Sequence, residues 1–155
     1  MGKALFYQLT RNPLEVTARS LLTRALAQEM RVMVRGRDPA QLASLDAALW
    51  QGDKASFLPH GLAGGPHDAD QPILLTTAQE SPNSARIVMA IDRAEAAPEE
   101  VAELERLWVL FSGDDREELD QARRQWKAMV AAGVVAEYWS EESGRWECKA
   151  RSGTA

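Results

Sequence analysis

The sequence predicts a single α/β domain in which a mostly parallel sheet is covered by helices on both faces. Short apolar runs alternate with segments that have the apolar spacing of a helix, which is the pattern of a doubly wound sheet. Most of the apolar runs are nearly continuous, as expected of strands that are buried on both faces. The 155 residues, 45% hydrophobic and 26% charged, suffice for one globular core and not for two large ones.

The first half of the chain contains two strand and helix pairs. Residues 4–9 form a short apolar run that ends at Thr-Arg-Asn-Pro, which predicts a buried first strand. Residues 14–29 then place apolar side chains three and four positions apart, which predicts a helix. Residues 31–34 predict the second strand, and the Asp-Pro pair at 38–39 predicts the start of a helix over residues 39–50.

The second half of the chain is expected to continue this alternation. Its last helix is the best marked, because an Asp-Asp pair at 114–115 can cap it and Gly133 ends it. Glu117 and Glu118 favour the positive N-terminal end of that helix, while three cations lie toward its negative end. The other expected elements are strands at residues 56–58, 72–76, 86–91, 107–111 and 134–139, and a helix at residues 98–105.

Composition argues against several classes of protein. The net charge of −5 argues against a protein whose whole surface binds nucleic acid, because such binding depends on clustered Lys and Arg. Cys148 is the single cysteine, so the chain forms neither an intrachain disulfide nor a thiolate zinc cage, which fits a reducing cytosol. No apolar stretch approaches the roughly 18 to 20 residues that span a bilayer, so we expect a cytoplasmic protein with no membrane partner. We expect residues 140–155, rich in Ser, Glu and Gly, to be a flexible tail after a domain at residues 1–139.

The sequence offers little that predicts chemistry. A phosphate cradle needs glycines between a strand and its helix, but residues 10–13 after the first strand contain none. His60 and His67 lie near Asp68 and Asp70 and could form a weak metal site or a general base. They lack the helical spacing of a metalloprotease pair and a nucleophile, so we interpret them as solvated loop residues. We expect no catalytic residue, cofactor or metal; a nucleotide-dependent enzyme on the same frame remains the alternative.

Two tryptophans stand out on the expected helices. Trp50 ends the helix at residues 39–50, where it is either a cap on the core or half exposed. Trp126 lies one helical turn after Arg123, with Lys127 at the border of the same face. The residues alone leave two interpretations of Trp126. It is either a core side chain flanked by solvated cations or part of a surface for a peptide with an aromatic end and a carboxylate.

Three stretches of the chain together resemble one known family. They are ALFYQL at residues 4–9, LDAALWQGDKASFLPHGLAG at residues 45–64 and ARRQWKAMVAAG at residues 122–133. Their order and spacing are similar to those of the chi subunit of bacterial DNA polymerase III, an accessory protein of the clamp-loader complex. The resemblance extends from residue 3 to about residue 139. The chain departs from the family at Trp126, where tyrosine is common, and in a longer tail past Trp139.

This resemblance implies a non-catalytic adaptor with a nucleotide-binding-like α/β fold that lacks the phosphate-binding loop. Such proteins bind the acidic C-terminal tail of single-stranded DNA-binding protein, which ends in Pro-Phe, and reach DNA only indirectly. They connect that tail to the clamp loader through the psi subunit, and a helicase competes for the psi surface. By position, the tail-binding residues are Arg123, Trp126 and Lys127, with Phe111 or Ser112 as a weaker assignment, and the second surface contains Phe57, Pro59 and His60, with Trp50 at the border of either surface.

Overall fold

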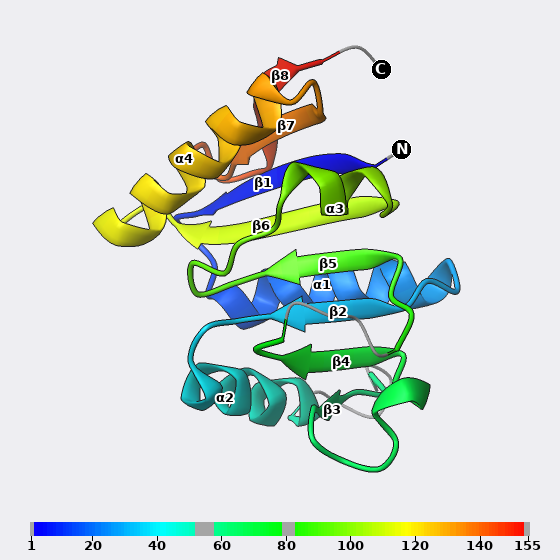
Figure 1. Cartoon of the computed structure of the whole chain (residues 1–155). Helices are drawn as coiled ribbons and strands as arrows, with labels where there is room; N and C mark the ends of the chain where they lie inside the picture. The colour runs from blue at the N-terminus through cyan, green and yellow to red at the C-terminus, as the bar shows by residue number, and fades with distance from the viewer. Residues whose placement is uncertain (1, 52–57, 79–82, 154–155) are drawn as a thin grey trace.

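The computed structural model describes residues 2–51, 58–78 and 83–153 of the chain. In these residues one eight-stranded sheet has the spatial order β3-β4-β2-β5-β6-β1-β7-β8 (Figure 1). Every neighbouring pair of strands is parallel except β7 and β8. In chain order the elements are β1 (Lys3–Leu9), α1 (Leu14–Ala27), β2 (Val32–Arg35), α2 (Pro39–Trp50), β3 (Gly61–Leu62), β4 (Ile73–Thr76), β5 (Ile87–Ala90), α3 (Pro98–Ala102), β6 (Arg106–Ser112), α4 (Arg116–Ala131), β7 (Val135–Ser140) and β8 (Glu147–Ser152).

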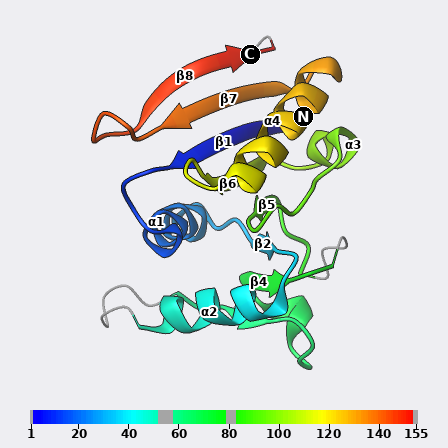
Figure 2. The same cartoon turned by 90° about the vertical axis from the view of Figure 1, so that its left-hand side faces the viewer.

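Two apolar layers lie on opposite faces of the sheet, because successive side chains of a strand point to opposite faces. In β1, Leu5 belongs to the layer under α1 and α2, whereas the next residue, Phe6, belongs to the layer under α3 and α4. Figure 2 shows α1 on one side of the sheet and α4 on the other. Helices therefore cover both faces, and the predicted parallel α/β sheet is confirmed.

The third strand differs from its prediction. Residues 56 and 57 lie outside the described residues, and Leu58 is buried but belongs to no strand. The edge strand β3 lies instead at Gly61–Leu62, between His60 and His67, which were both expected in a loop, and pairs in parallel with β4. Backbone hydrogen bonding at the sheet edge places it there, and a strand of two residues has no side-chain period that a sequence pattern could reveal.

The expected flexible tail contains the strand β8. This strand pairs antiparallel with β7 across a turn that includes Gly144, whose φ of +97° suits glycine. Trp146 packs edge to face against Tyr7 of β1, with the ring centroids 5.4 Å apart. The expectation of a flexible tail over residues 140–155 is therefore wrong for residues 146–152, because an aromatic contact holds Trp146 and strand pairing holds β8.

Side-chain caps begin two of the long helices where the sequence predicts. Asp38 accepts a hydrogen bond from the N–H of Ala40 at the start of α2, and Asp115 accepts one from the N–H of Glu118 at the start of α4. The helix α3 ends at Ala102, earlier than predicted, because the chain turns there to enter β6. No helix in the described parts of the chain is both long and apolar enough to span a bilayer.

Candidate functional site

The helix α4 carries the candidate site on one of its two flanks. Its buried face rests on the sheet through Ala122 and Met129. At 3.6 residues per turn, Arg123, Trp126 and Val130 then fall on one side of this face. This side of α4 is the flank next to β7, because the ring of Trp126 contacts Tyr138 of that strand. Among the described residues, Val130 is one of the few large apolar side chains that are exposed, with 39% of its surface accessible.

Trp126 is half-buried and forms the rim of an aromatic cluster. Its ring meets Phe6 edge to face at 5.4 Å between centroids and Tyr138 at 6.1 Å. Tyr138 in turn meets Phe111 at 5.8 Å and donates a hydrogen bond from its hydroxyl group to Gln8. Trp126 is therefore not a purely core side chain, because its indole packs on the core and keeps part of its surface accessible.

Two exposed cations stand beside this indole. Arg123 and Lys127 form no ion pair with any carboxylate in the described parts of the chain. Burial raises the pKa of the Tyr138 phenol, and the nearby charge of Arg123 opposes that rise. Arg123 thus lies close to the aromatic cluster, and the arrangement offers an unpaired guanidinium next to an accessible ring.

Phe111 and Ser112 take different places from the three residues on α4. Phe111 has only 2% of its surface exposed and supports Tyr138 from inside the core, so a partner does not reach it directly in this structure. Ser112 is half-buried at the end of β6. Its N–H donates to Glu118 and its hydroxyl group accepts from the N–H of Asp114. Phe111 therefore supports the aromatic cluster from inside the core, whereas Ser112 lies near the start of α4 and lines a separate crevice at the end of β6.

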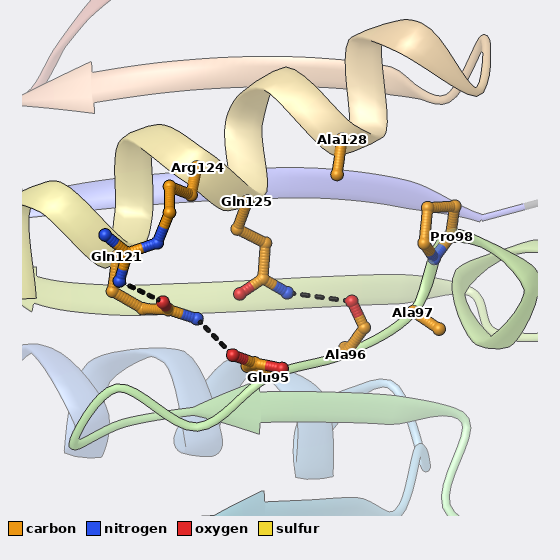
Figure 3. Close-up of a pocket in the computed structure, with 8 residues that line it drawn as sticks. All are labelled: Glu95, Ala96, Ala97, Pro98, Gln121, Arg124, Gln125 and Ala128. Carbon is orange, nitrogen blue, oxygen red and sulfur yellow. Dashed lines mark hydrogen bonds between the residues drawn. The ribbon is translucent and has the colours of Figure 1, made fainter.

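The opposite flank of α4 borders a groove that no sequence pattern predicted. The groove has a volume of about 470 Å³ and lies between α4 and the segment of residues 95–98 (Figure 3). The guanidinium of Arg124 donates to the side chain of Gln121, whose amide donates to Glu95, while Gln125 donates to the carbonyl of Ala96. Arg124 is thereby held on this flank, whereas its neighbour Arg123 lies on the flank next to β7.

The second predicted surface contains one exposed ring over one buried ring. Half of the Trp50 surface is exposed, and its ring stacks on His60 with centroids 4.1 Å apart. His60 is only 4% exposed: its Nδ1 lies 2.6 Å from the carbonyl of Leu58, and its Nε2 lies 3.2 Å from the carbonyl of Asp46. The interpretation of His60 as a solvated loop residue is therefore wrong, because backbone carbonyls and an indole enclose it.

The other residues of this surface are placed less completely. Pro59 is half-buried, and Leu62, two residues after His60, is 43% exposed. Phe57 lies outside the described residues. His67 is exposed, as predicted, and lies in a short turn rather than beside His60. No group of His, Cys, Asp and Glu suited to a metal ion occurs in the part of the chain that the structure describes.

The loop after β1, where a nucleotide-binding fold holds phosphate, holds a carboxylate of the chain itself. The backbone N–H groups of Thr10, Arg11 and Asn12 all donate to Oε2 of Glu141, at 3.0 to 3.2 Å. The side chain of Asn12 donates to Oε1 at 2.7 Å. Burial by itself raises the pKa of Glu141, but these hydrogen bonds outweigh it and hold the pKa below its usual range. Glu141 therefore fills the anion site of this loop.

The crevice beside that loop is acidic. It has a volume of about 460 Å³ and lies at the carboxyl ends of β1 and β6. Its lining has three carboxylates, those of Asp92, Asp114 and Glu118, against the one guanidinium of Arg11. Burial raises the pKa of Glu118, and the charges of Asp115 and Asp92 add to the rise. A phosphate group would meet like charges in this crevice.

Comparison with known protein families identifies the chain. No curated protein matches the sequence. The family model described as "DNA polymerase III chi subunit, HolC" matches residues 1–137 of the 155. This range includes α4 with Arg123, Trp126 and Lys127, and it includes Trp50, Pro59 and His60, but it ends inside β7 and before β8. The chain belongs to the family of DNA polymerase III chi subunits.

Proposed function

We propose that this chi-family chain is a non-catalytic adaptor in the cytoplasm that binds the acidic C-terminal tail of single-stranded DNA-binding protein. It links that tail to the clamp loader, through the psi subunit where psi is present. Membership of the family supplies the role as an accessory subunit of DNA polymerase III in replication. To this role we add binding of the tail peptide, contact with psi and contact with the helicase.

The observation that carries the proposal is the position of the exposed Arg123 one helical turn from the partly accessible ring of Trp126. An exposed guanidinium that pairs with no carboxylate among the described residues can hold the terminal carboxylate of a peptide through two parallel hydrogen bonds. The accessible indole, with Val130 exposed on the same flank, provides an apolar surface for a terminal phenyl ring. Lys127 adds charge toward the acidic residues that precede the ring.

A nucleotide-dependent enzyme on the same frame is the competing function, and two contacts oppose it. The three backbone donors of the loop after β1 are engaged by Glu141, so they are not available to a phosphate group. The crevice at the carboxyl ends of the strands carries carboxylates that repel the same group. A thermal-shift screen in which ATP or NAD raises the melting temperature by several degrees would support the enzyme instead.

The second surface fits a protein partner through Trp50. An exposed tryptophan held by stacking on a buried ring is a typical anchor of a protein interface. We assign this surface to psi or to the competing helicase, with Pro59 as a further member; Phe57, expected on the same surface, lies outside the described residues. His60 then acts by supporting the ring of Trp50 and not by direct contact.

Fluorescence polarisation with a labelled acidic peptide ending in Pro-Phe tests the proposal. We expect micromolar affinity, about −8 kcal/mol, that weakens with added salt. Replacement of Arg123 by alanine should weaken binding about tenfold, because it removes a charge-assisted hydrogen-bond pair. The same replacement of Arg124, its neighbour on the other flank, is the matched control and should leave the affinity unchanged.

A peptide with an amidated C-terminus makes the test specific for the carboxylate. The parent chain should bind the amidated peptide about tenfold more weakly than the free acid, and the Arg123→Ala chain should bind the two peptides equally. If Arg123→Ala and Trp126→Ala bind the free acid as well as the parent does, the proposed site is wrong. Tight binding to naked single-stranded DNA with a steep salt dependence would likewise contradict an indirect role on DNA.

A further inference from the structure

A second groove lies between α1 and the β7–β8 hairpin, on the face of the sheet opposite α4. Its volume is about 340 Å³, and its walls include Tyr7, Trp139 and Trp146 from the sheet and Val16 and Arg24 from α1. Trp139 and Trp146 lie beyond residue 137, where the match to the chi family ends. The groove is therefore built partly by a segment that this chain has in addition to the family region.

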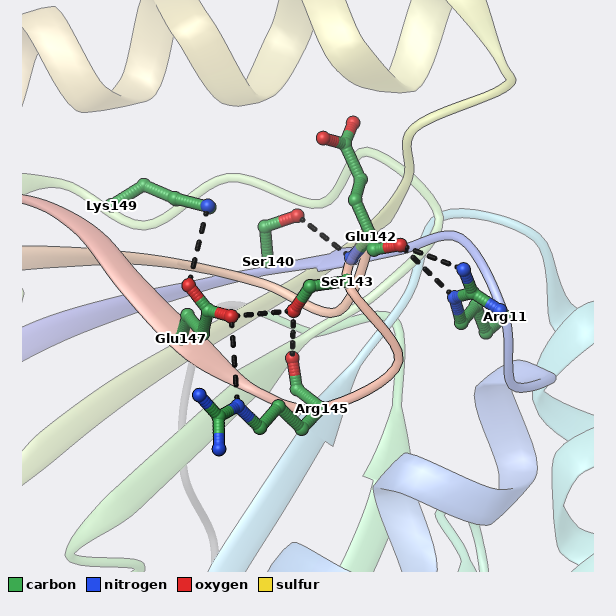
Figure 4. A network of polar contacts seen from close by, with 7 residues as sticks. All are labelled: Arg11, Ser140, Glu142, Ser143, Arg145, Glu147 and Lys149. Carbon is green, nitrogen blue, oxygen red and sulfur yellow. Dashed lines mark hydrogen bonds and ion pairs between the residues drawn. The ribbon is translucent and has the colours of Figure 1, made fainter.

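The hairpin wall of this groove is held firmly in place. Glu141 at the end of β7 is 2% exposed and is bonded to the loop after β1 through the backbone N–H groups of Thr10, Arg11 and Asn12. Figure 4 shows the guanidinium of Arg11 donating to the carbonyl of Glu142, and polar contacts that fix the turn itself. Such anchoring reduces the ordering cost that a binding partner must overcome.

The residue types in the groove are those that dominate the energy of protein interfaces. Tryptophan, tyrosine and arginine are enriched among residues whose truncation weakens binding strongly. Trp146 rests edge to face on Tyr7, so the aromatic wall is preorganised. Val16 at the rim is 49% exposed, an unusual exposure for a large apolar side chain in this chain. The groove therefore suits a bulky apolar side chain.

The charge of the groove favours a partner that carries a carboxylate. Arg24 is the one charged residue among the described residues that line it, and it makes no ion pair with a described carboxylate. The net charge of the protein is −5, so an unpaired cation beside an aromatic wall is a local exception. One cation complements a carboxylate, whereas a nucleic acid strand requires several phosphate contacts. A peptide that places a carboxylate beside a large apolar side chain therefore fits both the aromatic wall and the cation.

We propose that this groove is a second peptide-docking site, which takes a segment of a partner protein that carries bulky apolar residues next to Asp or Glu. The apolar residue packs between Trp146 and Val16, and the carboxylate pairs with Arg24. The site shares no residue with the flank of α4 that carries Arg123 and does not depend on the function proposed for that flank.

Titration of the ¹⁵N-labelled full chain, observed through its indole N–H signals, tests this site. The probe is the peptide acetyl-Glu-Leu-Phe-Glu-amide, with acetyl-Gln-Leu-Phe-Gln-amide as the charge control and acetyl-Glu-Ala-Ala-Glu-amide as the apolar control. We expect the acidic probe to shift Trp139 and Trp146 and to leave Trp126 unchanged. The Gln peptide should bind about threefold to fivefold more weakly, and the Ala peptide should not bind detectably.

Two variants separate this site from the one on α4. In Arg24→Gln the acidic and Gln peptides should bind equally, because the cation that distinguishes them is gone. Arg123→Ala should bind the acidic probe as the parent does. The proposal is overturned if the probe shifts Trp126 alone, or if the parent binds the acidic and Gln peptides equally. It is also overturned if sedimentation reveals a dimer that Trp146→Ala dissociates, because the groove would then belong to a second copy of the chain.

Discussion

Trp126 meets Phe6 edge to face, with the ring centroids 5.4 Å apart and the ring planes at 74°. Phe6 is fully buried in β1, so the indole on α4 is joined to the centre of the sheet. The same indole keeps part of its surface accessible beside Arg123. Binding and stability are therefore coupled at this residue, and experiments on it must measure both.

Replacement of Trp126 by tyrosine and by alanine separates these two contributions. We expect Trp126→Ala to lower the free energy of unfolding by about 2 to 4 kcal/mol, because it removes a large part of an aromatic cluster. Trp126→Tyr keeps a ring against Phe6 and Tyr138 and should cost less than about 1.5 kcal/mol. Urea denaturation gives the stabilities, and binding of the Pro-Phe peptide should survive in the tyrosine variant. Equal stability of parent and alanine variant would contradict the structural role of the ring.

Replacement of Trp50 should affect the binding of a partner more than the stability of the fold. Because half of its surface is exposed, we expect Trp50→Ala to lower the free energy of unfolding by less than about 1.5 kcal/mol. Its effect should appear in the affinity for purified psi or for the competing helicase, measured by calorimetric titration. Val130→Ala, which shortens another exposed apolar side chain, on α4 and away from this surface, is the control and should not change that affinity. Unchanged affinity in Trp50→Ala would remove the second surface from the proposal.

Glu141 should stabilise the fold in a pH-dependent manner. Its pKa is lowered in the folded chain, so the folded state favours the ionised carboxylate more strongly than the unfolded state does. The stabilisation is complete above the ordinary glutamate pKa of about 4.3 and decreases as the pH falls from there through the lowered folded value. At pH 7 we expect Glu141→Gln to lower the free energy of unfolding by about 1 to 3 kcal/mol.

Denaturation of parent and variant at several pH values measures this dependence. The difference between them should be constant near neutrality and shrink as the pH falls below about 4. Glu142→Gln is the matched control, because Glu142 is exposed and contributes only backbone groups to the contacts described here. A difference that does not change with pH would show that the charge of Glu141 has no part in the stabilisation.

Arg35 and Glu100 form an ion pair between a buried guanidinium and a half-buried carboxylate, and the pair links β2 to α3. Arg35 is fully buried, and its guanidinium donates to both carboxylate oxygens of Glu100, at 2.9 and 2.6 Å. Glu100→Ala leaves a buried charge without its carboxylate, so we expect a loss of about 3 to 5 kcal/mol of unfolding free energy. Glu99→Ala, at the neighbouring exposed position, should cost less than about 1 kcal/mol. Comparable stability of the two variants in thermal and urea denaturation would contradict this role.

Local signals in the sequence predicted the parts of the fold that local interactions form. The Asp caps of α2 and α4 and the continuous apolar runs of the central strands each depend on near neighbours in the chain, and these predictions are confirmed. The site on α4 was also accessible to prediction, because Arg123 and Trp126 are one turn apart. Whether these residues bind the peptide stays a prediction.

Contacts between distant residues account for what the sequence did not reveal. His60 is buried because Asp46 and Trp50 close over it from α2, and its own polar loop contains no sign of this. Glu141 appears in the sequence as one acid in a polar stretch, yet its partners lie about 130 positions earlier. The separation of Arg124 from Arg123 depends on a segment near residue 95, which helical spacing alone cannot place.

The pairing of β8 with β7 also has a consequence for solubility. A chain cut at residue 137, where the family match ends, would lose β8 and leave the remainder of β7 as an open edge. Unpaired N–H and C=O groups on such an edge invite pairing with other copies of the chain, which leads to aggregation. β8 presents Lys149 and Arg151 at the outer edge, and charged side chains there discourage such pairing. The additional hairpin therefore protects the shorter chi-like body from self-association.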